Sequence, residues 1–419
     1  MLASRRLRAG LAALVTAGLT LPLGGMAATA ATANAAHRAG PRPGGTLVIA
    51  AAGDALTLDP TLTTDENSKP VESLLYNSLV AIDQNLRFVP DLATRWTISP
   101  DGKTYTFYLR HGVVFHHGGT MTAADVRYSF QRLMDPKVAS PWASFFQPVT
   151  AVDTPNPYEV VVHLSQPYGP FLTAVASFLT VVPPSFVAQN KGNLTRVEDG
   201  TGPYELSSWT PGNEIVLMRN PHYFVPGEPY FQKIVFKVIP SDQSRIAALE
   251  SGQAQFGWFL DPTVGAQLQA LASQHRISLV RALSTEYHMF GFNTHWGPFQ
   301  SPLVRLALSY AINRGQILAA AADGQGMVSG LLTPALKTWA LPVQDYPSYR
   351  QNIAKAKALL RQAGYPHGFT FHIMSPPSFP VDNSDALIIQ QQLKAIGVKA
   401  IVDPTEWGTY VHTWVEKTF

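Results

Sequence analysis

Cysteine is absent from the 419-residue sequence. No disulfide can therefore stabilise the fold, no thiolate can act as a nucleophile, and no lipid-bearing cysteine can follow an export signal. Charged residues make up only 14% of the chain and hydrophobic residues 46%, a balance typical of a globular protein rather than a disordered one. The sequence also lacks a G-x-S-x-G hydrolase turn and an H-E-x-x-H zinc helix.

No apolar run is long enough to span a membrane. The candidate, Ala9 to Gly25, is interrupted by glycine and proline. It follows three arginines and precedes the small-residue site Ala33-Asn-Ala35, so residues 1–36 are predicted to be a signal peptide. The pair Arg5-Arg6 leaves both the twin-arginine and the Sec export routes open.

The mature chain is close to electrically neutral. The formal charge is +3, and removing the three arginines of the signal peptide from the 31 Lys+Arg leaves 28, against 28 Asp+Glu. A neutral protein has no electrostatic basis for binding nucleic acid. Residues 37–45 follow the signal peptide as a Pro/Gly-rich leader.

The stretch from Phe88 to Pro136 has the clearest pattern in the chain. Pro100-Asp-Gly102 predicts a turn, because Asp and Gly tolerate the backbone conformations of a tight reversal. Residues 104–110 alternate between apolar and polar types, which predicts a half-buried strand. Thr122 with Asp125 forms a capping-box pattern, so a helix is predicted to begin there and to stop before Pro136.

The order of residues in this stretch resembles the family 5 extracytoplasmic solute-binding proteins, the peptide and nickel receptors of ABC importers. The family pattern is "PDLA-x-x-W…DG-x-x-Y-x-F-x-LR-x-G-V-x-F-H-x-G…T-A-x-D-V-x-x-S". Its fixed positions are met by Pro90, Asp91, Leu92, Ala93, Trp96, Asp101, Gly102, Tyr105, Phe107, Leu109, Arg110, Gly112, Val113, Phe115, His116, Gly118, Thr122, Ala123, Asp125, Val126 and Ser129. His117 departs from it, because the family usually has Asp there.

Shorter matches extend the resemblance along the chain. The family's "LDP", "GTGPY" and "VR-x-A-L-x-Y-A-I-D" are similar to Leu58–Pro60, Gly200–Tyr204 and Val304–Asn313. Apolar patterns and cap residues predict helices at 71–80, 244–251, 353–363 and 384–396, and another that begins at Ser301. Strands are predicted at 46–51, 234–239 and 398–403, with a hairpin at 149–164. A strand-rich crossing is predicted from Ile277 to Asn293.

Two patterns suggest sites that the sequence does not support. His111, His116 and His117 lie close together in sequence, but two of them lie in a strand and turn that the resembled family uses structurally, and only His117 is extra. Without a further ligand of clear geometry, surface histidines are favoured over a metal site. The run Gly324-Gln-Gly326…Gly330 superficially resembles a dinucleotide turn. It follows a predicted helix and not a strand, which favours a loop. We therefore predict no metal and no cofactor.

The resemblance, rather than any local pattern, suggests which residues contact a ligand. In the family the loop after the first strand borders the ligand cleft, which implicates Asp54 and Thr57. Trp142 and Trp258 occupy positions where the family lines its cleft, and Glu406-Trp407 is similar to its "E/D-W" pair. The alternative for each tryptophan is a packing role. Residues 375–380 lack the arginine that dipeptide receptors place before the following helix.

The resemblance implies an α/β, two-lobed periplasmic-binding-protein fold of the large, three-subdomain type. We expect lobe 1 at 46–284 with an inserted subdomain at about 81–200, and lobe 2 at 285–419. Members of the family continue beyond the last position matched here, so lobe 2 is expected to be incomplete.

The expected function is that of a periplasmic, monomeric receptor for a peptide, nickel chelate, sugar or opine, acting with ABC permease subunits and without catalysis. A secreted hydrolase of peptides or glycans and a non-functional remnant are the alternatives.

Overall fold

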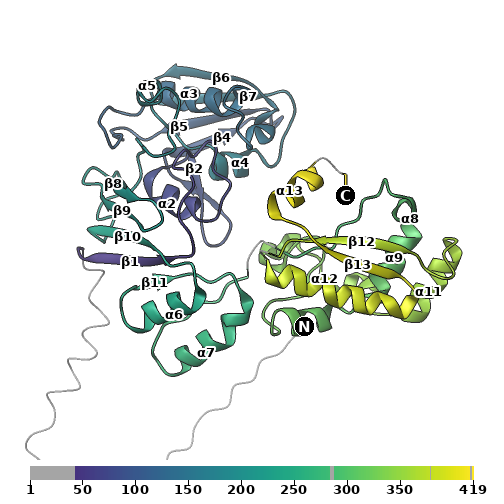
Figure 1. Ribbon diagram of the computed structural model, residues 1–419. Coiled ribbons are helices and arrows are strands. Elements are labelled where there is room, and N and C mark those ends of the chain that lie inside the picture. The colour runs from purple at the N-terminus through teal and green to yellow at the C-terminus, as the bar shows by residue number, and fades with distance from the viewer. Residues whose placement is uncertain (1–42, 284–286, 378, 416–417) are drawn as a thin grey trace, which may run out of the picture.

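The structure is a computed structural model that describes residues 43–283, 287–377, 379–415 and 418–419. Figure 1 shows two lobes of mixed helix and strand, the first coloured purple to teal and the second green to yellow. The predicted signal peptide, residues 1–36, lies outside the described residues. Within the described part of the chain, no helix combines the length and the apolar character needed to cross a membrane.

A five-stranded sheet forms the centre of the first lobe, in the order β11-β1-β10-β9-β8. Its strands are β1 (Thr46–Ala51), β8 (Tyr204–Thr210), β9 (Glu214–Arg219), β10 (Lys233–Val238) and β11 (Phe256–Gly257). Strand β1 is parallel to β10 and β11, whereas β8, β9 and β10 pair antiparallel. Apolar side chains of this sheet pack with Leu58 and with Leu75 of helix α2 (Ser68–Leu75).

Helix α2 ends at Leu75, before the predicted end at Val80, because a second segment approaches its last turn. The Gly202 amide donates a hydrogen bond of 2.9 Å to the Leu75 carbonyl oxygen. A Cβ atom at Gly202 would overlap the carbonyls of Leu74 and Leu75, so only glycine permits this approach. Val80 instead begins strand β2 (Val80–Ile82), which pairs with β3 (Phe88–Pro90).

A four-stranded antiparallel sheet, in the order β4-β5-β7-β6, forms the second part of the first lobe. Its strands and helices are β4 (Ala93–Ile98), β5 (Thr104–Leu109), β6 (Val149–Asn156), β7 (Glu159–Leu164), α3 (Ala123–Met134), α4 (Phe171–Phe178) and α5 (Pro184–Gln189). The predicted alternation in β5 is confirmed, with Phe107 fully buried against Phe130 of α3 in one core. The capping box of Thr122 and Asp125 is confirmed as well.

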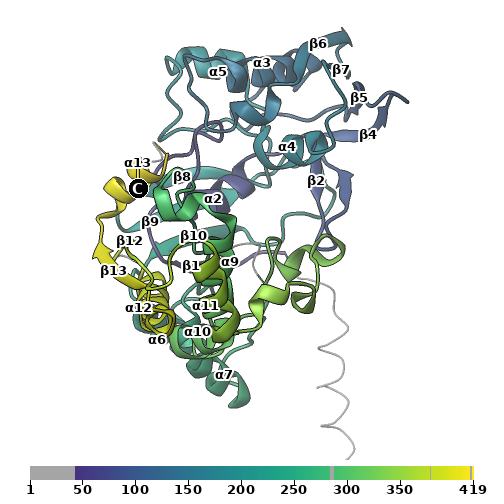
Figure 2. The ribbon, with the colours of Figure 1, turned by 90° about the vertical axis from the view of Figure 1, so that its right-hand side faces the viewer.

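Both views place the four-stranded sheet and α3 at one end of the first lobe, and α6 (Asp242–Glu250) and α7 (Gly265–Ser273) at the opposite end (Figures 1 and 2). The segment that leaves α7 for the second lobe differs from its prediction. Residues 277–283 and 287–293 form no strand, although a strand-rich crossing is predicted there. Their apolar side chains instead anchor the segment to the lobes: Leu279 packs with the α7 core and Phe290 with the core of the second lobe.

The second lobe contains a β-α-β unit, in which α12 connects the parallel strands β12 and β13. Its elements are α8 (Gly297–Gln300), α9 (Pro302–Ala311), α10 (Arg314–Ala321), α11 (Ile353–Gln362), β12 (Thr370–Ser375), α12 (Pro380–Leu393), β13 (Lys399–Pro404) and α13 (Trp407–Val415). Leu308, Leu360 and Leu393 are central to its core. Gly397 takes the left-handed conformation, with φ at 80°, and so ends the helical segment before β13.

Candidate ligand-binding site

A cavity of about 2670 Å³ is lined by residues of both lobes. The first lobe contributes strand β11 with the loop after it and residues 276–283. The second lobe contributes residues of 287–293, strand β12, and the first turns of α12 and α13. The volume exceeds the roughly 300–1,000 Å³ of common small-molecule pockets, so the cavity has room for a solute of several residues.

Trp258 and Trp407, both predicted to bind ligand, line this cavity from opposite lobes. Trp258 directly follows β11, whose pairing with β1 fixes the backbone, and its ring packs against the core of the five-stranded sheet. Trp407 begins α13 and stacks on Tyr410, with ring centroids 5.6 Å apart and an interplanar angle of 13°. An indole from each lobe therefore offers a flat apolar surface and an N–H donor to a solute.

A charged cluster of His288, Asp382 and Asp385 also lines the cavity. The His288 Nδ1 atom lies 2.8 Å from an Asp382 oxygen and 3.1 Å from an Asp385 oxygen. The hydrogen bond to Asp382 and then that to Asp385 raise the pKa of His288 to about 10, against a smaller lowering by burial. The imidazole is therefore protonated at neutral pH and forms an ion pair with both carboxylates.

Two further charged groups complete the polar part of the lining. His372 of β12 faces Asp403 of β13, with Nδ1 2.6 Å from a carboxylate oxygen. The half-buried Arg314 guanidinium lies 3.6 Å from the ring centroid of Tyr349 and donates hydrogen bonds to the Ser309 carbonyl and hydroxyl oxygens. Burial lowers the pKa of Arg314, because desolvation disfavours its charged form.

Asp54, Thr57 and Trp142 lie outside the lining of this cavity and contact other parts of the first lobe. The Asp54 carboxylate accepts hydrogen bonds from the Trp209 indole and the Gly212 amide, at 2.9 and 2.8 Å. Thr57 accepts one from the Asp59 amide, which lies in its own loop. Trp142 donates to the Thr63 carbonyl oxygen at 3.0 Å and stacks on Phe178, 4.3 Å away. Their contact with a ligand stays a prediction.

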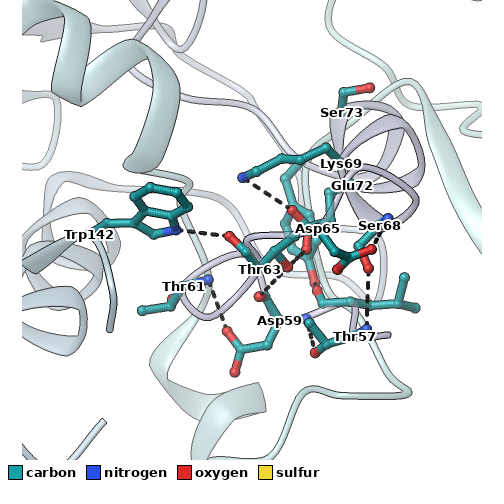
Figure 3. A network of polar contacts seen from close by, with 12 residues as sticks. Thr57, Asp59, Thr61, Thr63, Asp65, Ser68, Lys69, Glu72, Ser73 and Trp142 are labelled. Carbon is teal, nitrogen blue, oxygen red and sulfur yellow. Dashed lines mark hydrogen bonds and ion pairs between the residues drawn. The ribbon is translucent and has the colours of Figure 1, made fainter. Parts of the chain in front are cut away.

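Figure 3 shows the polar network that surrounds Thr63, between α2 and Trp142. The Thr63 hydroxyl contacts two acceptors, the Asp59 carbonyl oxygen at 2.9 Å and the Glu72 carboxyl group. One hydroxyl proton cannot serve both acceptors, but a neutral Glu72 can donate to Thr63 while Thr63 donates to Asp59. Burial raises the pKa of Glu72 to about 7, in agreement with this arrangement. The Lys69 ammonium group, whose Nζ lies 3.6 Å from a Glu72 carboxyl oxygen, opposes this rise in pKa.

His116 is not the surface histidine that its sequence context favours. Its side chain is only 1% exposed, and its two ring nitrogens face the Glu198 carboxylate at 2.7 Å and the Gly202 carbonyl oxygen at 3.0 Å. Burial lowers the pKa of His116, but the hydrogen bond and charge of Glu198 outweigh it, so the pKa is raised. Glu198 also accepts hydrogen bonds from the amides of Gly200 and Leu206. Glu198 thereby connects His116, which follows β5 of the four-stranded sheet, to β8 of the five-stranded sheet.

The aspartate of the "LDP" motif has a comparable structural role. Asp59 is 1% exposed and forms a two-pronged ion pair with Arg132 of α3, with contacts of 2.5 and 2.8 Å. Arg132 also donates to the Thr61 hydroxyl and to the Gly192 carbonyl oxygen. Paired, bidentate geometry of this kind is what allows two charges to be buried.

Sequence reasoning missed the cluster of His288, Asp382 and Asp385. A weak signal exists, because two acidic residues three positions apart near the start of a helix share one face. His288 has no comparable signal, since it lies in a segment without regular structure.

A two-lobed α/β fold with a solute-sized cavity between the lobes defines a class of protein, the extracytoplasmic binding proteins that take up a ligand between two lobes. The model of the bacterial extracellular solute-binding proteins, family 5 Middle, matches residues 87–419. The chain belongs to this family, as its motifs predict.

Individual relatives support the same assignment. The glutathione-binding protein GsiB of Escherichia coli strain K12 is 29% identical over 364 residues, which are 86% of this chain and 70% of GsiB. Helicobacter pylori DppA, solved with the peptide STSA, is 30% identical with a TM-score of 0.69 over 89% of this chain and 76% of DppA. Bacillus subtilis AppA, solved with a nonapeptide, is 26% identical with a TM-score of 0.72 over 89% of this chain and 77% of AppA. The chain is therefore the substrate-binding component of an ABC import system.

Proposed function

We propose that this receptor captures a peptide or a similar small solute in the cavity between its lobes. The observation that carries the proposal is the pair of indoles, Trp258 from one lobe and Trp407 from the other, on the walls of one cavity of about 2670 Å³. The volume suits a ligand of several residues, and the peptides bound to DppA and AppA support that size. Aromatic walls bind apolar parts of a solute without demanding one particular sequence.

Arg314 supports a ligand that carries a carboxylate. Its hydrogen bonds to Ser309 and its contact with the Tyr349 ring involve neutral groups, so none of these partners compensates its charge. A guanidinium on a cavity wall recognises a carboxylate by paired hydrogen bonds. A peptide presents such a group at its C-terminus.

Capture would work by lobe closure rather than by chemistry. A solute that contacts both walls stabilises the closed arrangement, because only that arrangement allows all of its contacts at once. We expect the lobes at 46–284 and 285–419, with the inserted subdomain at about 81–200, to move as units. The loaded monomer would then deliver the unchanged solute to permease subunits from the periplasm, after removal of residues 1–36.

Binding of the peptide STSA, a nonapeptide and glutathione to the purified protein, followed by titration calorimetry, tests the proposal. Trp258→Ala should weaken binding by ~1–3 kcal/mol, the usual range for an aromatic anchor. Trp339→Ala is the matched control, because that indole is 76% exposed and lies outside the cavity lining.

Equal affinity in the wild type and Trp258→Ala would place Trp258 in a packing role. Absence of binding by all three solutes would exclude a peptide-like ligand, and release of cleavage products would favour a hydrolase instead.

A further inference from the structure

The cluster of His288, Asp382 and Asp385 combines one imidazole nitrogen and two carboxylates on the cavity wall. One donor atom from each residue lies within 4.8 Å of the other two. The two N···O distances are 2.8 and 3.1 Å. Ligands placed about 2.1 Å from a metal ion at right angles to one another are roughly 3.0 Å apart. These two N···O distances, which are also those of hydrogen bonds, therefore match neighbouring ligands in an octahedral site.

Two separate parts of the second lobe provide these donors. Asp382 and Asp385 lie three positions apart in the first turns of α12, so one face of a 14-residue helix presents both. His288 belongs to the segment that connects the lobes. A helix fixes the spacing of the carboxylates, while the histidine comes from the connection.

The exposure of the cluster leaves room for additional ligands. The side chains of His288, Asp382 and Asp385 are 54, 40 and 18% exposed, and all three line the cavity. An ion held on one side by three protein ligands would keep its remaining positions open to the cavity. A mixed nitrogen and oxygen set with open positions suits first-row transition metals such as Mn²⁺, Ni²⁺ or Zn²⁺, whereas Ca²⁺ prefers oxygen ligands alone.

We propose that His288, Asp382 and Asp385 form a three-ligand site for a divalent first-row transition metal on the cavity wall. The ion would replace the proton on His288 Nδ1, which is released to solvent, and solvent or a chelating solute would complete the coordination. The site requires no peptide to be present, so this proposal stands independently of the proposed solute.

His372 provides a matched control in the same cavity. It pairs with one aspartate, Asp403, at 2.6 Å, and its side chain is 60% exposed, close to the 54% of His288. It therefore reproduces an exposed His–Asp pair without the third ligand. A metal bound through exposed histidines in general would depend on both residues equally.

The test uses the full chain without a histidine tag, stripped of metal and titrated separately with Mn²⁺, Ni²⁺ and Zn²⁺ salts, with bound metal counted after dialysis. The proposal expects one equivalent of at least one ion. His288→Ala and the double change Asp382→Asn with Asp385→Asn should each weaken binding beyond the roughly 10–100-fold typical of losing a group that only orients a metal ligand. His372→Ala should change it less than about twofold.

Thermal unfolding of each variant shows that the fold is retained. The asparagine variant keeps the shape of the cluster, so it separates ligand loss from local unfolding. Failure to retain any of the three ions, equal losses in His288→Ala and His372→Ala, or unchanged affinity in the asparagine variant would each overturn the proposal. In those cases the cluster is an ion pair that holds the connecting segment against α12.

Discussion

Replacing Glu72 by glutamine is expected to remove a pH-dependent loss of stability from the first lobe. The Glu72 side chain is 4% exposed, and burial is the largest cause that raises its pKa from 4.5 to about 7. The contact with Thr63 and the charge of Lys69 lower the pKa but do not cancel the effect of burial. Folded Glu72 therefore keeps a proton that the unfolded chain has already released at pH 6.

The sign and size of the effect follow from proton linkage. Between pH 4.5 and about 7 the folded state binds more protons than the unfolded state, so stability falls as the pH rises. The rise from 4.5 to about 7, at ~1.36 kcal/mol for each unit of pKa, corresponds to about 3 kcal/mol. Glutamine does not titrate and can still donate a hydrogen bond to Thr63. Glu72→Gln should match the wild type below pH 4.5 and exceed its stability by up to about 3 kcal/mol above pH 7.

Urea denaturation of both proteins at several fixed pH values measures this difference in unfolding free energy. If more than one unfolding transition is seen, the comparison uses the one whose midpoint the substitution changes. Other titrating groups, including His116, are common to both proteins and cancel in the comparison. Lys69→Met is the matched control, because loss of the ammonium group 3.6 Å from Glu72 should raise its pKa further and steepen the decline. A stability difference between wild type and Glu72→Gln that is the same at every pH would refute the reasoning.

Two further substitutions test the structural roles assigned to the family motifs. Arg132→Met should destabilise the first lobe by ~3–5 kcal/mol in urea denaturation, because it leaves the buried Asp59 carboxylate without its ion pair. Adding Asp59→Asn should restore part of the lost stability. If it restores none, the ion-pair account is contradicted. Gly202→Ala should lower the melting temperature through overlap with the Leu74 and Leu75 carbonyls. Gly169→Ala is the control, because nothing lies within 4 Å of the added Cβ and φ at Gly169 is not positive, so the melting temperature should not change. Equal effects of the two substitutions would contradict the packing account.

Local elements were predictable because their causes lie within a few residues. The alternation of β5 and the capping box of Thr122 and Asp125 need only neighbouring side chains and backbone, and both are confirmed. The segment from Ile277 to Asn293 shows the limit of such patterns. Its apolar residues suit a strand, but a strand also needs a partner with which to form a ladder, and its described residues pack on the lobe cores instead.

Candidate site residues were harder to predict, because their surroundings come from distant parts of the chain. The partner of His116 is Glu198, which lies 82 positions later, so burial of that histidine has no local signature. His288 and Asp385 are similarly separated by 97 positions. The resemblance to the family selected positions such as Trp258 and Trp407, but it could not show that they share a cavity. That fact depends on how the two lobes are arranged.

The buried Glu198 carboxylate contacts both His116 and the Leu206 amide, and so holds Leu206 in place before any solute binds. Leu206 and Trp258 pack in the same core, so the first-lobe wall of the cavity is already ordered when the protein folds. Its conformational entropy is then not lost again on binding. Trp407, by contrast, is 46% exposed and rests on Tyr410 of its own helix and on Phe379. The ordering cost of binding should therefore fall mainly on the second lobe, and solutes should differ in affinity chiefly through the contacts they make there.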